Sequence, residues 1–325
     1  MTIKQQVINM LTENIGNYIS GEDIAAALGC SRGAVWKAVK SLKNDGYAIN
    51  AVTNKGYKLD TDADILSFEG VNKYIDKKLS GLDIQVFSSI DSTNNYLKSI
   101  AESGAKEGTI AIASQQTGGK GRLGRSFFSP ADSGLYMSIL LRPRIPADKA
   151  VRITTVAAVA VAMAVQKAFS VSADIKWVND VYIKGKKICG ILTEASLDME
   201  SGGLDYAVCG IGINIYEPKD GFPEEIRQTA GAILNKRTAD AKNKMAAELI
   251  NSFFELYTSN NEKAYLSEYK KRLIWVGEQI NLFRGEDSIS ATMLGVNDDC
   301  ALLVRYHDGT EATITSGEIS IRKKT

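Results

Sequence analysis

A glycine-rich basic stretch at residues 116–130 reads QTGGKGRLGRSFFSP. It contains Lys120, Arg122 and Arg125 but no aspartate or glutamate. Glycine allows the backbone to approach a ligand closely, and N–H groups beside cations are typical of a site for an anion. The stretch therefore predicts a flexible loop that wraps an anionic ligand during turnover. The alternative is a mobile surface loop whose charges have no ligand.

Two known phosphate-binding motifs overlap in this stretch. Gly119, Gly121 and Gly124 spell G-x-G-x-x-G, the dinucleotide fingerprint, and the same residues approach a P-loop that lacks its lysine. Both motifs require a helix directly after the glycines. Pro130 and Gly134 follow instead, in a segment that favours extended chain. We therefore expect neither a Rossmann nucleotide site nor a P-loop.

Three further segments contain candidate site residues within or beside predicted helices and strands. DSTN (91–94) opens a predicted helix, where it either holds a small polar ligand or simply caps the helix. KWVND (176–180) begins at the end of a predicted strand, so its lysine is either a site residue or a solvated strand end. CGIGIN (209–214) puts glycines inside a strand, where glycine usually marks a close approach by another group.

Residues 1–60 predict three short helices and a β-hairpin, the element order of a winged helix-turn-helix domain. Ile3, Val7 and Leu11 form the apolar stripe of the first helix. The helix-turn-helix occupies about residues 20–39, with a capping box at its start and a Gly-Cys-Ser turn in its middle. An Asn-Lys-Gly turn then joins the two strands of the hairpin.

The third predicted helix, about residues 31–44, has an apolar face and a cationic face and contains no acidic residue. Val35, Val39 and Leu42 mark the core side. The opposite face and the hairpin tip carry the residues expected to meet DNA: Arg32, Gly33, Trp36, Lys37, Lys40, Lys43 and Lys55. Such a face supplies cations for phosphates and side chains for base edges. The alternative is a solvated lysine face, with the tryptophan as a packing residue.

Length and composition limit the class of protein. With 325 residues, 44% hydrophobic residues and a net charge of +1, the chain is predicted to form about two or three ordinary globular domains. The net charge does not favour nucleic acid or membrane, so such a role must be local. The longest apolar run, Val156–Val165, is too short to span a bilayer and predicts a buried helix. We expect no membrane partner.

The cysteines and the histidine exclude several kinds of site. Four cysteines are scattered without a C-x-x-C pair, and the first residues lack the apolar region of a signal peptide. We therefore expect reduced thiols in a cytoplasmic protein. The single histidine, His307, lies in a predicted turn. One histidine rules out an H-E-x-x-H zinc site and argues against a serine triad, so we predict no metal held by the protein alone.

The chain is predicted to divide into residues 1–62, 63–271 and 272–325, with the acidic join DTDADI between the first two. The middle region mixes strands with helices at about 148–169 and 242–267. Its strands are expected at residues 84–90, 109–115, 134–143, 175–178, 187–196 and 206–215. The last fifty or so residues alternate apolar and polar types between turns, which predicts a small β-barrel.

Six motifs give the sequence a specific resemblance. DSTN, QTGGKGRLGR, KWVND, KICGIL, GIGIN and the terminal GEISIR occur in the order found in biotin protein ligases, over essentially the full length. The first domain resembles that of the bifunctional kind, which also represses biotin genes. The resemblance implies an α+β multidomain fold: a winged helix-turn-helix, a class II synthetase-like mixed α/β catalytic domain and a C-terminal SH3-like β-barrel.

The resemblance also implies a two-step reaction. Biotin and ATP, with Mg²⁺ on the triphosphate, give biotinyl-5′-AMP and pyrophosphate. The biotinyl group then passes to a lysine of the biotin carboxyl carrier domain of acetyl-CoA or pyruvate carboxylase. Biotinyl-5′-AMP acts as co-repressor, and the homodimer that it stabilises binds the operator DNA of biotin genes.

Family roles can be carried over residue by residue. The residues expected to bind biotin are Ser92, Thr93, Asn94, Gln116, Lys120, Gly121, Arg122, Lys176, Gly210 and Gly212. Those expected to bind ATP or the adenylate are Arg122, Arg125, Phe127, Lys176, Asn179, Asn214 and Arg322. Lys176 and Arg122 are the expected catalytic residues, because a fixed cation between a carboxylate and an α-phosphate lowers their repulsion.

The sequence departs from the family pattern at three positions. Lys120 replaces the usual arginine, Val178 a proline and Phe127 a tryptophan against which adenine is expected to stack. None of these changes removes a group that the chemistry requires, so they bear on rates and nucleotide affinity. Two alternatives stay open from the sequence: a lipoate ligase, which shares the fold, and a biotin-sensing transcription factor without enzyme activity.

Overall fold

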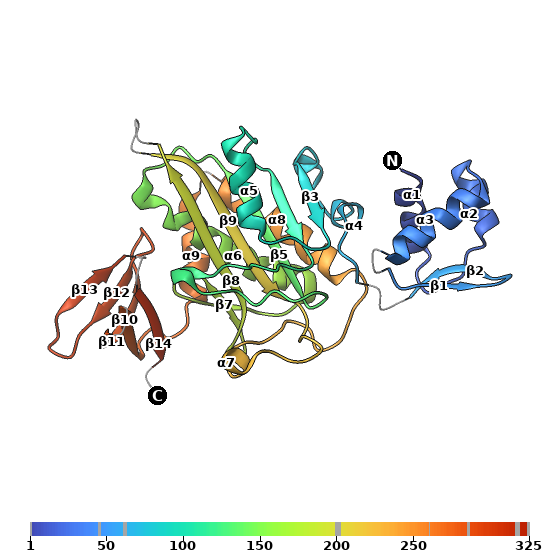
Figure 1. Ribbon diagram of the computed structural model, residues 1–325. Helices are drawn as coiled ribbons and strands as arrows, with labels where there is room; N and C mark the ends of the chain where they lie inside the picture. Colours follow the sequence, from blue (N-terminus) through green and yellow to red (C-terminus); the bar gives the residue numbers. More distant parts are fainter. Residues whose placement is uncertain are drawn as a thin grey trace. The chain divides into compact units, whose positions relative to one another are not determined.

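The computed structural model describes most of the chain (Figure 1). The described residues are 2–44, 47–60, 64–198, 203–259, 261–284, 287–315 and 319–323. They fall into two compact units. The first comprises Met1–Tyr74 with Lys236–Lys244, and the second comprises Ile75–Asn235 with Met245–Thr325.

The first unit contains the predicted helix-turn-helix and hairpin. Its elements are α1 (Ile3–Glu13), α2 (Gly21–Leu28), α3 (Arg32–Asn44), β1 (Ile49–Val52), β2 (Gly56–Leu59) and the short α4 (Phe68–Asn72). The strands β1 and β2 pair antiparallel, so that the predicted order of three helices and a wing is confirmed. The middle of the acidic join, residues 61–63, lies outside the described residues.

Local side-chain bonds determine where α2 and α3 begin. Ser20 Oγ accepts a hydrogen bond from the Asp23 amide at 3.0 Å and donates one to the Asp23 carboxylate at 2.7 Å. Gly29 ends α2 with a φ of 60°, a left-handed conformation that glycine adopts without a Cβ clash. Ser31 Oγ then accepts from the Ala34 amide at 3.2 Å. The predicted cap at the start of α2 is confirmed, and with the Ser31 cap and Gly29 it sets the turn between the helices.

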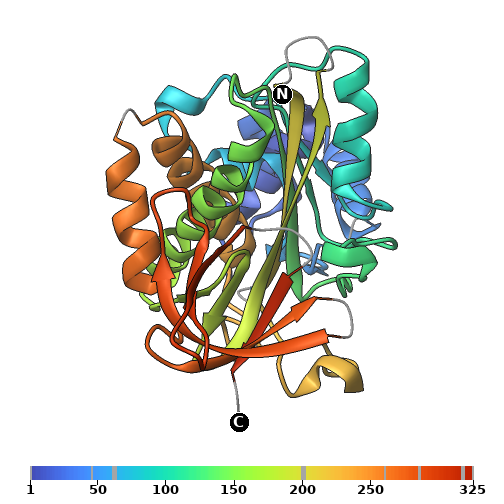
Figure 2. The same ribbon diagram turned by 90° about the vertical axis from the view of Figure 1, so that its left-hand side faces the viewer.

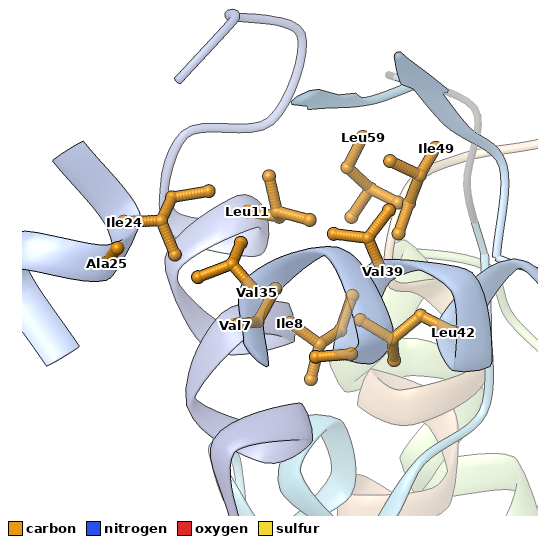
Figure 3. Packing of buried hydrophobic residues seen from close by; sticks show 11 residues of the cluster. Val7, Ile8, Leu11, Ile24, Ala25, Val35, Val39, Leu42, Ile49 and Leu59 are labelled. Carbon is orange, nitrogen blue, oxygen red and sulfur yellow. The ribbon is translucent and has the colours of Figure 1, made fainter. Parts of the chain in front are cut away.

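The core of this unit joins the three helices to the wing, as Figure 3 shows. Its buried residues are Val7, Ile8, Leu11, Ile24, Ala25, Val35, Ala38, Val39, Leu42, Ile49 and Leu59. Ile3, which the sequence placed in the same stripe, is 39% exposed, because it stands in the first turn of α1, before the packed part of the helix. The apolar face predicted for α3 is confirmed, so its other face is available to solvent.

The second unit is built on a seven-stranded mixed sheet of strand order β3-β4-β5-β9-β8-β7-β6. The strands are β3 (Ile84–Phe87), β4 (Ile110–Ala113), β5 (Gly134–Leu141), β6 (Asp174–Lys176), β7 (Asp180–Ile183), β8 (Lys186–Leu197) and β9 (Leu204–Asn214). Only β3 and β4 pair parallel. All six predicted strands are present, and β7 is additional.

Helices cover both faces of this sheet, α5 (Thr93–Glu102) on one and α6 (Val151–Phe169) on the other (Figures 1 and 2). The apolar run in α6 is buried as predicted. No helix among the described residues is both long and apolar enough to cross a bilayer. One-turn 3-10 helices occur at Lys77–Leu79, Arg122–Gly124 and Ala147–Lys149.

Three helices follow β9: α7 (Glu224–Arg227), α8 (Ala241–Tyr257) and α9 (Glu262–Arg272). The single helix predicted at 242–267 is wrong. Thr258, Ser259 and Asn261 lie between the two helices, and such side chains favour turns by bonding to nearby backbone. The Asn261 amide, for example, donates to Ser259 Oγ at 3.1 Å. This break lets α9 fold back and pack along α6.

The C-terminal region forms a five-stranded antiparallel sheet, orange to red in Figure 2. Its strands are β10 (Gln279–Arg284), β11 (Asp287–Val296), β12 (Leu302–Arg305), β13 (Glu311–Ile314) and β14 (Ile319–Lys323), in the order β13-β12-β11-β10-β14. His307 is exposed in the turn between β12 and β13, as predicted. The predicted strands are therefore present as an antiparallel sheet, while their closure into a small β-barrel stays a prediction.

Candidate active site

A cavity of about 710 Å³ lies over the face of the central sheet that α5 covers. Residues that pair directly across neighbouring strands point to the same face, and one such row crosses five strands. The row is Tyr136, Gly212, Gly190, Asp180 and Lys176, and all five residues line the cavity. The two glycines in the middle of the row have no side chain, so the cavity floor is a trough. Tyr136 lies at one end of the trough, and the charged Asp180 and Lys176 lie at the other.

The Phe127 ring lies in this trough. A Cβ atom at Gly212 would overlap the ring, and one at Gly190 would lie 3.0 Å from it. The ring also meets Tyr136 edge to face, with centroids 6.4 Å apart. The sequence prediction that the strand glycines mark a close approach is confirmed at Gly212.

The start of α5 and the strand β5 form a polar cluster at one end of the cavity. Ser92 caps the helix by accepting from the Asn95 amide at 3.4 Å. Thr93 donates to Gln116 Oε1 from its amide at 2.9 Å and from its hydroxyl at 3.1 Å. Gln116 Nε2 donates to Ser129 Oγ at 3.2 Å. Helix capping is therefore observed and Ser92, Thr93 and Gln116 also line the cavity, while their binding of a small polar ligand stays a prediction.

Asn94 is held in one orientation although it is almost fully buried. Its Oδ1 accepts from Ser138 Oγ at 2.6 Å, and its Nδ2 donates to Glu194 Oε2 at 2.8 Å. Gly210, opposite Ser138 in the sheet, leaves room for the Asn94 amide, with which a Cβ would overlap. Lys98 completes the network with an ion pair to Glu194 at 2.6 Å.

Glu194 keeps its charge in this network. Burial acts to raise the pKa of its carboxyl group, but the hydrogen bonds from Lys98 and Asn94 outweigh burial and hold the pKa below its ordinary value. Neither Glu194 nor Ser138 was predicted from the sequence. For Ser138 there was a signal: it is the only polar side chain within the apolar strand β5 apart from a tyrosine, and a buried hydroxyl needs a partner.

The basic loop leaves β4 and returns as a narrow hairpin. The Gly118 amide donates to the Asp91 carbonyl at 2.8 Å, and the Gly121 amide donates to the Arg125 carbonyl at 2.7 Å. Leu123 stands at the tip, 54% exposed and with a φ of 57°. Residues 125–130 follow the loop without forming a helix, and a turn at 131–133 then leads into β5. The rejection of both the Rossmann and the P-loop motif is confirmed.

Arg122 turns from this loop toward β7. Its guanidinium donates to Asn179 Oδ1 at 3.0 Å, and Asn179 Nδ2 donates to the Ile191 carbonyl at 2.8 Å. Burial lowers the pKa of Arg122 from its ordinary value, while the nearby carboxylate of Asp180 acts to raise it. Because the ordinary pKa of arginine lies far above neutral pH, the side chain remains a cation at neutral pH.

The other cationic side chains of the cavity differ in their contacts and exposure. Lys120 donates to Asn95 Oδ1 at 2.8 Å, and Arg125 is exposed at the rim. Lys176 ends β6, as predicted, and its ammonium lies over the Trp275 ring. Lys187, which was not predicted from the sequence, pairs with Asp180 at 2.6 Å.

Two remaining predicted residues lie toward the second half of the chain. Asn214 lines the cavity and donates to the Gly231 carbonyl at 3.0 Å, which ties the end of β9 to the segment after α7. Arg322 pairs with Asn281 along β14, and its side chain lies outside the described part of the structure. Ile321 and Lys323, its neighbours, line the cavity. Apart from Arg322, every residue expected to bind biotin or nucleotide lines this one cavity.

The predicted nucleic-acid face of the first unit is exposed. Its residues are Arg32, Gly33, Trp36, Lys37, Lys40 and Lys43 on α3, with Lys55 at the tip of the wing. Trp36 is 53% exposed, and Lys40 Nζ lies 5.1 Å from its ring centroid. The alternative that Trp36 is a packing residue is therefore wrong. Figure 3 shows Val35, Val39 and Leu42 of the same helix directed into the core.

Metal-ligating side chains do not gather at any one place in the described ranges. Within them, no three or more His, Cys, Asp or Glu side chains are placed to hold a metal ion. The described cysteines are all free thiols.

Family profiles match all three parts of the chain. Residues 86–214 match the biotin/lipoate A/B protein ligase family, residues 4–58 an HTH domain, and residues 276–322 the biotin protein ligase C-terminal domain. A biotin protein ligase of Aquifex aeolicus in complex with biotin and ATP has a similar structure: the TM-score is 0.60 and the identity 27%, covering 74% of this chain and 99% of that one.

Curated relatives extend the match to the whole chain. The bifunctional ligase/repressor BirA of Bacillus spizizenii is 37% identical over 71% of both chains. BirA of Escherichia coli is 31% identical over 99% of this chain and 98% of its own length. The resemblance inferred from six motifs is thereby confirmed, and the chain belongs to the bifunctional ligase/repressor family of biotin protein ligases.

Proposed function

We propose that this protein activates biotin with ATP, transfers the biotinyl group to a carrier lysine, and represses transcription from an operator. The observation that carries the ligase function is the arrangement of the cavity. A cluster of oriented amide and hydroxyl groups lies at one end, a glycine-floored trough in the middle, and Lys176 with Arg122 at the other. A ligand with a polar ring, an apolar chain and a terminal carboxylate matches this order.

Biotin is such a ligand. Its ureido ring would bind to Ser92, Thr93, Asn94 and Gln116, whose hydrogen bonds already fix their orientation. Lys120 and Gly121 would close over it, with Gly210 and Gly212 beneath. Its valeryl chain would run beside the Phe127 ring, over the glycine floor, and bring the carboxylate to Lys176. Lipoate lacks the ureido group and could not form the hydrogen bonds that these amide and hydroxyl groups offer to it, so it should bind more weakly.

In the first step a carboxylate oxygen of biotin attacks the α-phosphorus of ATP. The bond from this phosphorus to the oxygen that bridges to the β-phosphate breaks, and pyrophosphate leaves. Lys176 would stand between the two reacting anions and stabilise the charge that grows on the phosphoryl oxygens. Arg122 would bind the same phosphate from the basic loop, held in place by its bond to Asn179. No protein nucleophile is required.

The nucleotide would be held by residues from three parts of the chain. We assign the adenine to the Phe127 ring, the phosphates to Arg122 and Arg125, and the support of ATP to Asn214 and Arg322. Mg²⁺ usually binds one or two carboxylates together with phosphate oxygens. Asp180 and Asn179, adjacent on the cavity wall, fit that donor set, and the ion would neutralise the leaving pyrophosphate.

In the second step the neutral ε-amine of the carrier lysine attacks the acyl carbon of the mixed anhydride, and AMP leaves. The acceptor class that we propose is the carrier domain of a biotin-dependent carboxylase. Because ATP, carboxylase and operator DNA are all cytoplasmic in bacteria, we place the protein there.

For the repressor function we propose a homodimer that forms with biotinyl-5′-AMP bound. One copy of α3 and one wing present few cations, and two copies related by a two-fold axis would double them on a palindromic operator. Arg32, Lys37, Lys40, Lys43 and Lys55 would bind phosphates, and Gly33 and Trp36 would approach the bases. We propose domain boundaries at residues 1–62, 63–271 and 272–325. We also propose that the catalytic domain is related to class II synthetases and that the C-terminal sheet closes into an SH3-like barrel.

Pyrophosphate release tests the ligase function directly. Purified protein should release pyrophosphate from ATP when biotin and a carrier domain are added, and the carrier should gain the mass of one biotinyl group. Lipoate, at the same concentration, should give only background release. Equal release with the two acids, or release with lipoate alone, would show that the cavity serves another substrate.

A further inference from the structure

We infer that Trp275 and Tyr182 are positioning residues for adenylate formation. Their two rings flank the ammonium group of Lys176, and we call this pair the aromatic clamp. The inference rests on the proposed ligase function and adds to it a part for the C-terminal region. Lys176 Nζ lies 5.4 Å from the Trp275 ring centroid and 5.9 Å from the Tyr182 ring centroid. Both distances fall within the roughly 6 Å over which a cation is attracted to the face of an aromatic ring.

The sheet register brings Tyr182 to the lysine. Asp180 lies directly opposite Lys176 across β6 and β7, and Tyr182 stands two residues further along β7 on the same face. Such diagonal neighbours are within reach of an aromatic side chain. Burial, and secondly the nearby Asp180 carboxylate, raise the pKa of Tyr182, so that its phenol stays neutral and cannot compete as an anion for the lysine.

Trp275 reaches the same lysine from the segment between α9 and β10. The Ile274 amide donates to the Ile175 carbonyl at 3.0 Å, so this segment runs beside the strand that ends in Lys176. The Trp275 carbonyl accepts from the Glu278 amide at 3.0 Å, and the residue has a φ of 69°. A bulky side chain is rarely found in the left-handed region, and it persists there only when its surroundings fix it.

The surroundings also explain why aromatic rings suit this position. Asp180, the carboxylate opposite Lys176, is ion-paired with Lys187 at 2.6 Å. A ring face orders an ammonium group without neutralising its charge, whereas a carboxylate would have to be displaced when the substrate anions arrive. Trp275 and Tyr182 both line the cavity. The clamp therefore keeps a flexible four-carbon side chain aligned at the cavity.

The clamp predicts a graded loss of rate. Truncating either ring leaves Lys176 charged but less ordered, and we expect Trp275→Leu to lower kcat for adenylate formation about three- to tenfold, the scale of one cation–π contact. The KM for biotin should change little, because the polar cluster at the other end of the cavity is untouched. Trp275→Phe and Tyr182→Phe retain a ring face and should recover most of the rate.

Fluorinated tryptophans at position 275 distinguish an electrostatic effect of the ring on Lys176 from an effect of its packing alone. Each added ring fluorine weakens the electrostatic attraction of the ring with little change of shape, so kcat should fall stepwise along the series. A flat series at position 275, in a wild-type background that releases pyrophosphate with biotin, overturns the clamp and leaves the ligase function standing.

A measurement without substrates tests the contact itself. The ε-methylene resonances of Lys176, assigned by their absence in Lys176→Arg, should be shifted by the ring current of Trp275 in the free protein. The shift should shrink in Trp275→Leu at unchanged melting temperature. Unshifted resonances in the folded wild-type protein would overturn the inference whatever the substrate proves to be.

Discussion

The ligand cavity and the exposed face of α3 both gather cations, but they hold them in different ways. In the cavity Arg122 is bonded to Asn179, Lys187 is paired with Asp180, and Lys176 lies over two aromatic rings. On α3 the cations project into solvent, and the contact described there is that of Lys40 with the exposed ring of Trp36.

This difference matches the two tasks. A transition state needs charges that are already in place, because each group that must be ordered during the reaction reduces the stabilisation it gives. Binding to a DNA backbone depends mainly on released counterions and tolerates mobile side chains. Substitutions in the cavity should therefore change rates at constant salt, whereas substitutions on α3 should change the salt dependence of affinity.

The largest effect is expected for Lys176→Ala. Removal of the cation between carboxylate and α-phosphate should slow adenylate formation by roughly 10²-fold or more, the scale of one group that stabilises a transition state. The melting temperature should stay close to wild type, since the lysine ends a strand and lines a cavity. Single-turnover measurement of biotinyl-AMP checks the rate, and Lys106→Ala, at an exposed lysine in the same unit, serves as the matched control. A near wild-type rate in Lys176→Ala would remove this residue from the mechanism.

A smaller effect, of another kind, is expected on α3. Lys37→Ala should weaken operator binding several-fold. If each monomer loses one phosphate contact, the slope of log affinity against log salt concentration should become less steep by about one per monomer. Adenylate formation should be unchanged. Fluorescence anisotropy of a labelled operator at four or more salt concentrations gives the slope. If Lys37→Ala altered the affinity but left the slope as in wild type, Lys37 would not bind a phosphate.

The smallest effect concerns the Glu194 network. The pKa of Glu194 lies below its ordinary value in the folded protein, so its carboxylate stabilises the fold above the ordinary pKa of about 4.3, and this contribution is lost as the pH falls through the folded value. The difference in free energy of unfolding between wild type and Glu194→Gln should be constant from neutral pH to about 5 and shrink at lower pH. Urea titrations at each pH measure it, with the exposed Glu102→Gln for comparison. A difference that grows on acidification would contradict the ion pair.

The first unit was almost fully predictable, because local rules decide it. Ser20, Ser31 and Gly29 mark helix ends through bonds to residues three or four positions away. An apolar stripe then orients α3 and exposes its cations. The central strands were likewise predicted from their apolar runs. The exclusion of a Rossmann or P-loop motif was predicted from the absence of a helix after the glycines.

The site could be predicted only in part, because register is not a local property. The row from Tyr136 to Lys176 depends on how five strands pair, and β7 was not recognised as a strand. Trp275 gave no signal, since it lies roughly a hundred residues from Lys176 in a segment without periodicity. The break between α8 and α9 was not predicted, because the helix expected at 242–267 was continued through the polar residues after Tyr257.

Operator affinity with and without biotin plus ATP tests most directly the claim that one chain couples the two cationic regions. In wild type the ligands should tighten operator binding and shift sedimentation toward a dimer, because we propose that the dimer forms with biotinyl-5′-AMP bound. Lys176→Ala should bind the operator as wild type does without ligands and should fail to respond to biotin plus ATP. Preformed biotinyl-5′-AMP should restore the response. Equal operator affinity in wild type with and without the ligands would contradict the coupling.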